Sequence, residues 1–277
     1  MHEWPLLIFT VFTPAAIGGV LFLYLIHRRV ANSNEEMISI MKLPLFVIVA
    51  ISFIGLAASF LHLGSPENAF NAVRGFGRSW MSNEIVVTGA FIALICLTAG
   101  LMMIQKKVTP ILLVLTGVIG LVDIYCMATA YAVTRVNGWH HINTYVVFYG
   151  TAFALGPILG TSLILPKVKG DQINSIVKRA FSMVLFGVAI QIIGSSMLAG
   201  YNPEVQMIEG QTAINKLAPY NSLIGIRWVI ELLGLSILGY MSMTTNKKIS
   251  YSLVYAALLV FAAAEGMSRY VFYVLGS

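Results

Sequence analysis

A polar stretch near the start of the chain carries the side chains best suited to acid–base chemistry. Residues 61 to 85 read LHLGSPENAFNAVRGFGRSWMSNEI, with His62 at one end and Glu84 at the other. An imidazole titrates near neutral pH, and a carboxylate beside water can pass a proton to solvent. Each residue also has a simpler interpretation, His62 as an interfacial side chain and Glu84 as a first-turn carboxylate favoured by a helix dipole. Together they predict a site for proton transfer.

The rest of the chain is too apolar for a soluble protein. Of 277 residues, 58% are hydrophobic and only 10% are charged, whereas soluble domains carry roughly 25% charged residues. A bilayer core takes about 20 apolar residues per helix, and lipid leaves helices as the natural spanning element. We therefore predict an all-α integral membrane protein, one polytopic domain over residues 1–277. The eight predicted transmembrane helices cover residues 5–26, 43–63, 85–104, 109–134, 143–165, 180–200, 222–243 and 250–275.

The basic residues predict the orientation of these helices. Most of the seventeen lysines and arginines fall in the connections after helices 1, 3, 5 and 7. By the positive-inside rule these connections face the cytoplasm, so both termini and the loop of residues 64–84 face the outer, periplasmic side. The net charge of +6 thus reflects topology and does not indicate a nucleic-acid partner.

The loop of residues 64–84 is expected to contain a short interfacial helix. Ser65 can cap it, with Pro66 in its first turn, and Gly75 and Gly77 can end it. The sequence Ser82-Asn83-Glu84 is expected to cap the next transmembrane helix.

Charged residues fall well inside the predicted spans at Asp123, Glu231, Glu265 and Arg269, where charges are expensive and tend to be functional. Glu265 and Arg269 stand four residues apart, on one helix face, and form either a structural ion pair or a proton route or quinone contact. Asp123 is either bonded to a hydroxyl of a neighbouring helix or part of such a route. Together with Glu231 and Glu265, it is a candidate for a polar path across the membrane.

No cofactor is expected in this chain. The histidines, residues 2, 27, 62, 140 and 141, all lie at segment ends, so no facing pair for a b-type haem is evident. Zinc at His140 and His141 is disfavoured even more, because adjacent residues seldom point together and no cysteine or aspartate accompanies them. Cys96 and Cys126 are expected to be free thiols, and without a C-x-x-C run any iron–sulfur cluster must lie on another protein.

Three segments carry a resemblance to a known family. They are His2-Glu3-Trp4-Pro5-Leu6, the run Leu61-His62-Leu63-Gly64-Ser65-Pro66, and Ser82-Asn83-Glu84-Ile85, with sparser matches at Arg227, Glu265, Arg269, Phe272 and Tyr273. On these residues the chain resembles the membrane-anchor subunit of dimethyl sulfoxide reductase, the DmsC-type family. The resemblance is close over the first 85 residues and weak between about 90 and 220.

The resemblance implies a haem-free, multi-pass anchor in the bacterial cytoplasmic (inner) membrane. Such anchors oxidise menaquinol in anaerobic respiration and pass the electrons to an iron–sulfur subunit, which feeds a molybdopterin catalytic subunit. His62 and Glu84 match the family's residues for quinol binding and oxidation, and His62 would accept a proton while Glu84 handles its release. The predicted quinol-binding set is completed by Ser65, Arg74, Arg227, Glu265 and Arg269. Arg74 and Arg78 either position the head group or dock the iron–sulfur partner, and docking is favoured because arginine is enriched at interfaces.

Two alternatives remain open on the sequence. One is a proton-translocating, quinone-interacting subunit of a related respiratory complex. The other, of a different class, is a transporter or a structural anchor without redox function. Whether the isolated chain is an enzyme is also open, because quinol oxidation requires an electron acceptor on a partner.

Overall fold

A computed structural model shows eight long helices. It describes residues 4–27, 31, 33–62, 69–134, 136–168, 171–201, 213–244 and 251–276. Within these residues, eight helices are long and apolar enough to cross a membrane. They are α1 (Trp4–Ile26), α2 (Asn34–His62), α4 (Trp80–Gln105), α5 (Pro110–Ala132), α6 (Ile142–Ile164), α7 (Asp171–Ala199), α9 (Asn221–Met243) and α10 (Tyr251–Val274). The shorter elements are α3 (Ala69–Arg74), η3 (Leu165–Lys167), α8 (Ala213–Leu217) and η4 (Ala218–Tyr220).

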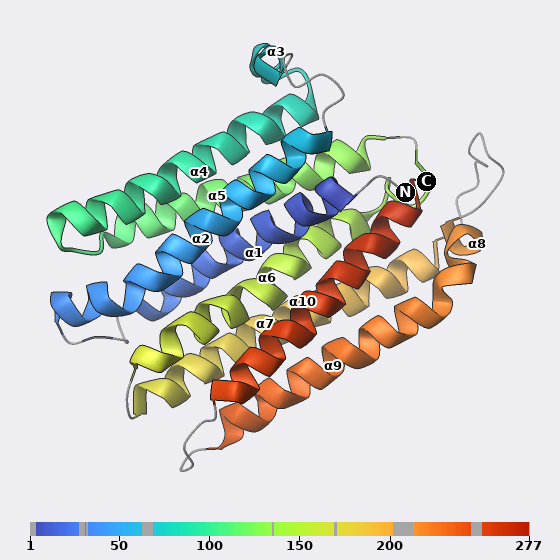
Figure 1. Cartoon of the computed structure of the whole chain (residues 1–277). Coiled ribbons are helices and arrows are strands. Elements are labelled where there is room, and N and C mark those ends of the chain that lie inside the picture. Colours follow the sequence, from blue (N-terminus) through green and yellow to red (C-terminus); the bar gives the residue numbers. More distant parts are fainter. Residues whose placement is uncertain are drawn as a thin grey trace.

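The long helices run side by side, each antiparallel to the next along the chain (Figure 1). Both termini, α3 and α8 lie at one end of the bundle, which we call the termini end. The start of α4, the start of α6, the end of α7 and the start of α9 therefore share this end. The sequence prediction that the termini end faces the periplasm rests on the basic residues alone.

The eight predicted spans are confirmed, but three helices begin earlier than expected. The structure starts α2 at Asn34, α7 at Asp171 and α4 at Trp80. At α2, the side chain of Ser33 accepts a hydrogen bond from the backbone N–H of Glu36 at 3.2 Å, which caps a polar first turn. Hydropathy marks only the apolar part of such a helix, so the polar turns that extend beyond it were missed.

The expectation that Ser82-Asn83-Glu84 caps a helix is wrong. The helix already begins at Trp80, because Ser79 has the extended backbone (φ −130°, ψ 132°) of a capping position. The side chain of Asn83 instead accepts a hydrogen bond from the N–H of Gly77 at 2.7 Å and holds the preceding turn. Gly77 itself has φ +79°, a left-handed conformation that favours glycine, just after α3. Ser65 and Pro66, the expected start of the short helix, lie outside the described residues.

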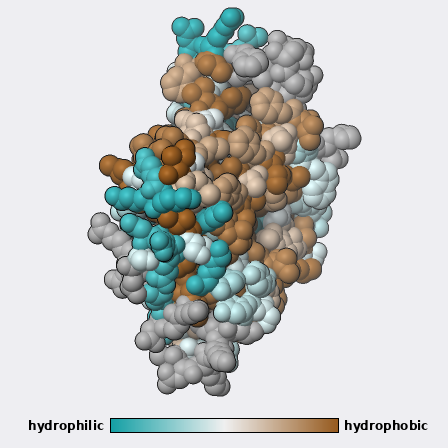
Figure 2. Space-filling model, turned by 60° about the vertical axis from the view of Figure 1, so that its left-hand side comes forward, coloured by the Kyte–Doolittle hydropathy of each residue, from teal (hydrophilic) through white to brown (hydrophobic). Residues whose placement is uncertain are grey.

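Helix α1 is the centre of the bundle and packs against α2, α5, α6 and α10. Its contact with α6 is very close, because a Cβ added to Gly18 would lie 1.9 Å from the carbonyl oxygen of Ala152. Small residues allow such close helix approach in membranes. On the outside, apolar side chains cover broad areas between patches of hydrophilic ones (Figure 2), as a surface in contact with lipid requires. Cys96 and Cys126 are free, as predicted.

Candidate functional site

Glu84 lies on the second turn of α4, near the termini end, and is half-buried. Its carboxylate is within electrostatic range of Asp123 on α5 and of Tyr131 and Tyr273. Asp123 is fully buried, and its Oδ1 accepts a hydrogen bond from the hydroxyl of Thr88 at 2.7 Å. Its Oδ2 has no partner among the described residues. Glu84 therefore stands at the outer edge of a buried acidic and phenolic group.

The other residues predicted in the loop are described only in part. His62 is the last residue of α2, which packs against α4, so its backbone lies at the same end of the bundle as Glu84. Its side chain and all of Ser65 lie outside the described part. Arg74, at the end of α3, and Arg78, in the turn that follows, are exposed.

A second polar cluster lies inside the half of the bundle formed by α6, α7, α9 and α10. Gln191 of α7 is almost fully buried, and its Nε2 donates a hydrogen bond to Oε1 of Glu265 at 2.8 Å. The Oε1 of Gln191 accepts a hydrogen bond from Arg227 of α9. Arg227 also forms an ion pair with Glu231, one turn further along α9, at 2.7 Å. A single amide thus connects α7, α9 and α10.

Glu265 and Arg269 meet through Thr151 of α6. The hydroxyl of Thr151 donates to Oε2 of Glu265 at 2.7 Å, and Nη2 of Arg269 donates to the same hydroxyl oxygen at 3.2 Å. The guanidinium of Arg269 lies 3.8 Å from the ring centre of Phe148, a cation–π contact, and is completely buried. The predicted four-residue spacing does place both groups on one face, and a hydroxyl from α6 links them.

A pair of tyrosines lies near both polar groups. The hydroxyls of Tyr131 on α5 and Tyr273 on α10 are 2.8 Å apart, and Tyr273 is 3.2 Å from the hydroxyl of Thr10 on α1. Glu84 and Arg269 are both within electrostatic range of the two tyrosines. The tyrosine pair is therefore close to Glu84 and to Arg269.

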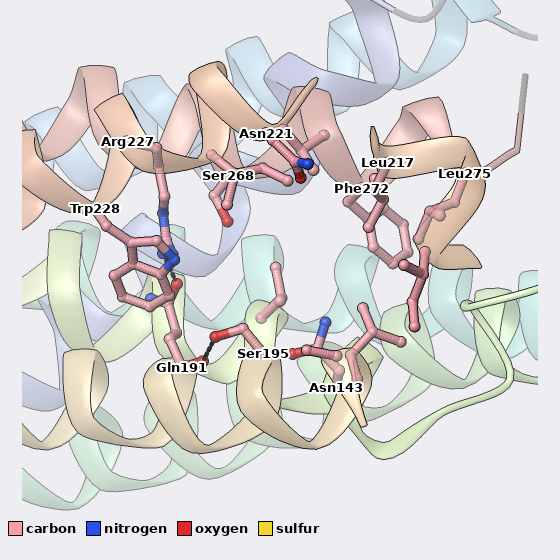
Figure 3. A pocket seen from close by; sticks show the side chains of 16 residues that line it. Asn143, Gln191, Ser195, Leu217, Asn221, Arg227, Trp228, Ser268, Phe272 and Leu275 are labelled. Carbon is pink, nitrogen blue, oxygen red and sulfur yellow. Dashed lines mark hydrogen bonds between the residues drawn. The ribbon is translucent and has the colours of Figure 1, made fainter. Parts of the chain in front are cut away.

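A cavity of about 260 Å³ opens beside the Gln191 cluster at the termini end (Figure 3). Its lining comes from α6, α7, α8, α9 and α10 together with the residue after α10. Most of the wall is apolar, and Asn143, Gln191, Ser195, Asn221, Arg227 and Ser268 add polar groups. Mostly apolar pockets with a few convergent polar groups are typical of ligand sites in proteins.

Several of these residues were missed in the sequence, namely Gln191, Thr151, Asn143 and Tyr131. Gln191 was the easiest of them to recognise as a candidate, because it is a lone amide within a long apolar run of α7. Asn143 resembles many polar residues at helix starts, and Thr151 resembles the many single threonines inside apolar helices. Only the packing of α6 against α7 and α10 shows what surrounds them. Among the described residues, no three His, Cys, Asp or Glu side chains gather as a metal site would require.

Comparison with known proteins identifies the family. The family model described as "DMSO reductase anchor subunit (DmsC)" matches residues 1–275. The chain belongs to this family. It is 30% identical to the C component of the anaerobic dimethyl sulfoxide reductase of Escherichia coli K12 and 28% identical to that of Haemophilus influenzae. These matches cover 98% and 99% of this chain and 94% of each relative.

A more distant relative is the C component of a sulfite dehydrogenase from Allochromatium vinosum, 29% identical over 43% of this chain and 40% of that protein. No solved structure matches the chain. Membership in the DmsC family, with eight apolar helices, makes this a multi-pass membrane protein and the anchor of a multisubunit reductase. The family match also covers residues 90–220, where the resemblance in the sequence was weak.

Proposed function

We propose that this anchor oxidises menaquinol at the termini end, using His62 and Glu84, and passes the electrons to an iron–sulfur subunit of a molybdopterin-dependent reductase. The observation that carries the proposal is the position of Glu84. It is half-buried at the start of α4, beside the helix that ends at His62, with buried Asp123 and the tyrosine pair behind it. A carboxylate there can contact both a lipid-soluble substrate and water.

Quinol oxidation requires this chain to bind the quinol and to accept its protons. A quinol that becomes a quinone loses two protons and two electrons. In the proposed mechanism, His62 accepts one hydroxyl proton, Glu84 accepts the other, and both protons leave to water at the termini end. The electrons go to the iron–sulfur clusters of the partner, so no redox group is needed in this chain, which we propose to be haem-free.

The remaining predicted residues take separate roles in this proposal. Arg74 and Arg78, exposed on and after α3, would dock the iron–sulfur subunit, because arginine is favoured at protein interfaces. Ser65, outside the described residues, is proposed to take part in quinol binding. Arg227 lines the cavity, whereas Glu265 and Arg269 are buried behind it. We therefore assign Glu265 and Arg269 an indirect role, through Gln191 and Thr151.

The test is reduction of the partner's iron–sulfur clusters by a naphthoquinol in membranes that contain the whole complex. His62→Ala and Glu84→Gln are expected to assemble normally and to slow cluster reduction by at least about 100-fold, as loss of a general base does. Glu35→Gln is the matched control, because Glu35 is an exposed carboxylate at the opposite end of the bundle. Wild-type rates in both test variants would refute the proposal.

Proton translocation is the second candidate, and the buried polar groups are the observation that favours it. Asp123, Glu231 and Glu265 are the buried carboxylates of the described chain. Each lies about ten residues, or roughly 15 Å, from the termini end of its helix, which is near the middle of a bilayer of about 30 Å. The carboxylates thus reach halfway across, and the rest of a path would depend on hydroxyl groups and water.

A measured proton-to-electron ratio separates the two candidates. Quinol oxidation with release on one side gives one proton per electron at the termini side and none taken up opposite. A higher ratio that falls to this value in Glu265→Gln would establish translocation. A transporter without redox function would instead act as a lone subunit, without an iron–sulfur partner.

A further inference from the structure

We propose that the cavity between α6, α7, α9 and α10 is a second quinone-binding site, separate from the site of oxidation. The inference rests on the proposed function in one respect, that quinone is the substrate of this anchor. Its own basis is the composition of the cavity wall, two buried polar atoms that lack partners, and the charge balance of Arg227.

The shape and lining of the cavity suit a membrane-soluble ring. It is lined by apolar side chains from five helices, among them Val147, Leu198, Ile224 and Val271. Figure 3 shows Leu217, Phe272 and Leu275 on one side and the pair of Gln191 and Arg227 on the other. A ring bound here would have an apolar surround and a polar edge. This combination is typical of sites for amphiphilic small molecules.

Two polar atoms of lining residues are buried without a hydrogen-bond partner among the described residues. They are the acceptor Oδ1 of Asn143 and the donor Nε of Arg227. Both residues are more than nine-tenths buried, with exposed fractions of 8% and 6%. Burying such groups unpaired is unfavourable, so a ligand that pairs with them would bind favourably. Both atoms are enclosed by protein, and Oδ1 of Asn143 lies beside Gly194 of α7. Rotation of these side chains toward the cavity would let a quinol hydroxyl donate to Asn143 and a quinone carbonyl accept from Arg227.

The charges around the cavity favour an uncharged head group. Arg227 is the charged residue of the lining, and Glu231 neutralises it at 2.7 Å. Its guanidinium also lies 3.8 Å from the ring centre of Trp228, and its Nη2 is held by Gln191. An anionic head group such as a phosphate would find no free positive charge among the described residues of this wall. A neutral quinone or quinol meets no such penalty.

The cavity is distinct from the Glu84 site and lacks the groups for oxidation. None of its described lining residues belongs to α2, α4 or α5. The described part of the wall contains no histidine or carboxylate, so it offers no base for the quinol protons. The site therefore binds quinone without oxidising quinol, and it can hold one molecule while another reacts near Glu84.

The test uses the purified whole complex in lipid nanodiscs with a photoreactive naphthoquinone that carries a short isoprenoid tail. After illumination, mass spectrometry maps the labelled peptides. The cavity is blocked with Ala199→Phe, because Ala199 lines it on α7. The matched control is Ala189→Phe, which changes an exposed alanine of the same helix that does not line the cavity.

We expect labelling on peptides of α7, α9 or α10 that line the cavity, competed by excess unlabelled naphthoquinone but not by excess dioleoylglycerol. This labelling should fall at least about 10-fold in Ala199→Phe and persist in Ala189→Phe. Competition by the glycerolipid alone would show a lipid site, and absence of cavity labelling would show no ligand site; either result overturns the inference. Glu84→Gln separates it from the proposed function, because that variant should keep cavity labelling while it loses quinol-driven cluster reduction.

Discussion

The side-chain amide nitrogen of Gln191 donates a hydrogen bond to Glu265 at 2.8 Å, and the amide oxygen accepts one from Arg227. An amide is suited to this position because it can donate to a carboxylate and accept from a guanidinium at the same time. Since Arg227 lines the cavity and Glu265 lies behind it, Gln191 sets the position of the cavity's polar edge.

Replacement of Gln191 by leucine should therefore destabilise this half of the bundle. The change removes both hydrogen bonds and leaves a buried carboxylate and a buried guanidinium each short of a partner, at a cost of about 1–3 kcal/mol. The loss is measurable as a lower thermal unfolding temperature of the purified complex. Ile190→Leu, an apolar change at the neighbouring residue of α7, is the control and should be neutral. Equal unfolding temperatures for Gln191→Leu and wild type would contradict the assigned role.

The absence of a side chain at Gly150 of α6 leaves room for the side chain of Gln191. A Cβ at this position would lie 2.3 Å from Cγ and 2.6 Å from Nε2 of Gln191. Gly150→Ala should displace the amide from Glu265 and lower stability in the same way as Gln191→Leu. The combined variant should be little worse than either single one, because both break the same contact.

Gly100→Ala is the matched control for this substitution, because a Cβ there meets no atom within 4 Å. In a helix interior that change should be neutral or stabilise by up to about 1 kcal/mol. If the two alanine variants unfolded at the same temperature, close packing at Gly150 would not be the cause.

The hydrogen bond between Tyr131 and Tyr273, at 2.8 Å, is open to a double-mutant cycle. Tyr131→Phe and Tyr273→Phe each remove a hydroxyl and keep the ring, and Tyr273→Phe also breaks the contact with Thr10. We expect a coupling of about 0.5–1.5 kcal/mol in the unfolding free energy, the usual net value of one hydrogen bond. Additive effects would show that the hydroxyls do not interact.

The sequence predicted the spans well because each of the eight long helices in the described part of the chain carries an apolar run long enough to cross a membrane, and hydropathy detects such runs directly. It drew attention to Glu84 because that residue stands where an apolar segment begins, and the role of Glu84 stays a prediction. It could not show that Glu265 bonds to Gln191 and Thr151. These partners are 74 and 114 residues away from Glu265 along the chain, and they meet it only when α6, α7 and α10 pack together. Ser82-Asn83-Glu84 misled for a local reason, since Ser79 and Trp80 start the helix before the point that hydropathy indicates.

His141 predicts a pH dependence of stability at the termini end. It caps α6, and its Nδ1 accepts a hydrogen bond from the backbone N–H of Asn143 at 3.1 Å, which requires an unprotonated nitrogen. Burial lowers the pKa of His141 below its usual 6.5. The folded state therefore prefers the neutral ring, while the unfolded chain takes up a proton near pH 6.5. The contribution is complete above that pH and is lost as the pH falls below it toward the lower pKa of the folded state.

Unfolding temperatures of the complex between about pH 8 and about pH 5 will measure this contribution. In His141→Asn the side-chain oxygen can still cap α6, but the titrating ring is gone. The variant should lose less stability than wild type over this range. Identical slopes in the two proteins would show that protonation of His141 is not linked to folding.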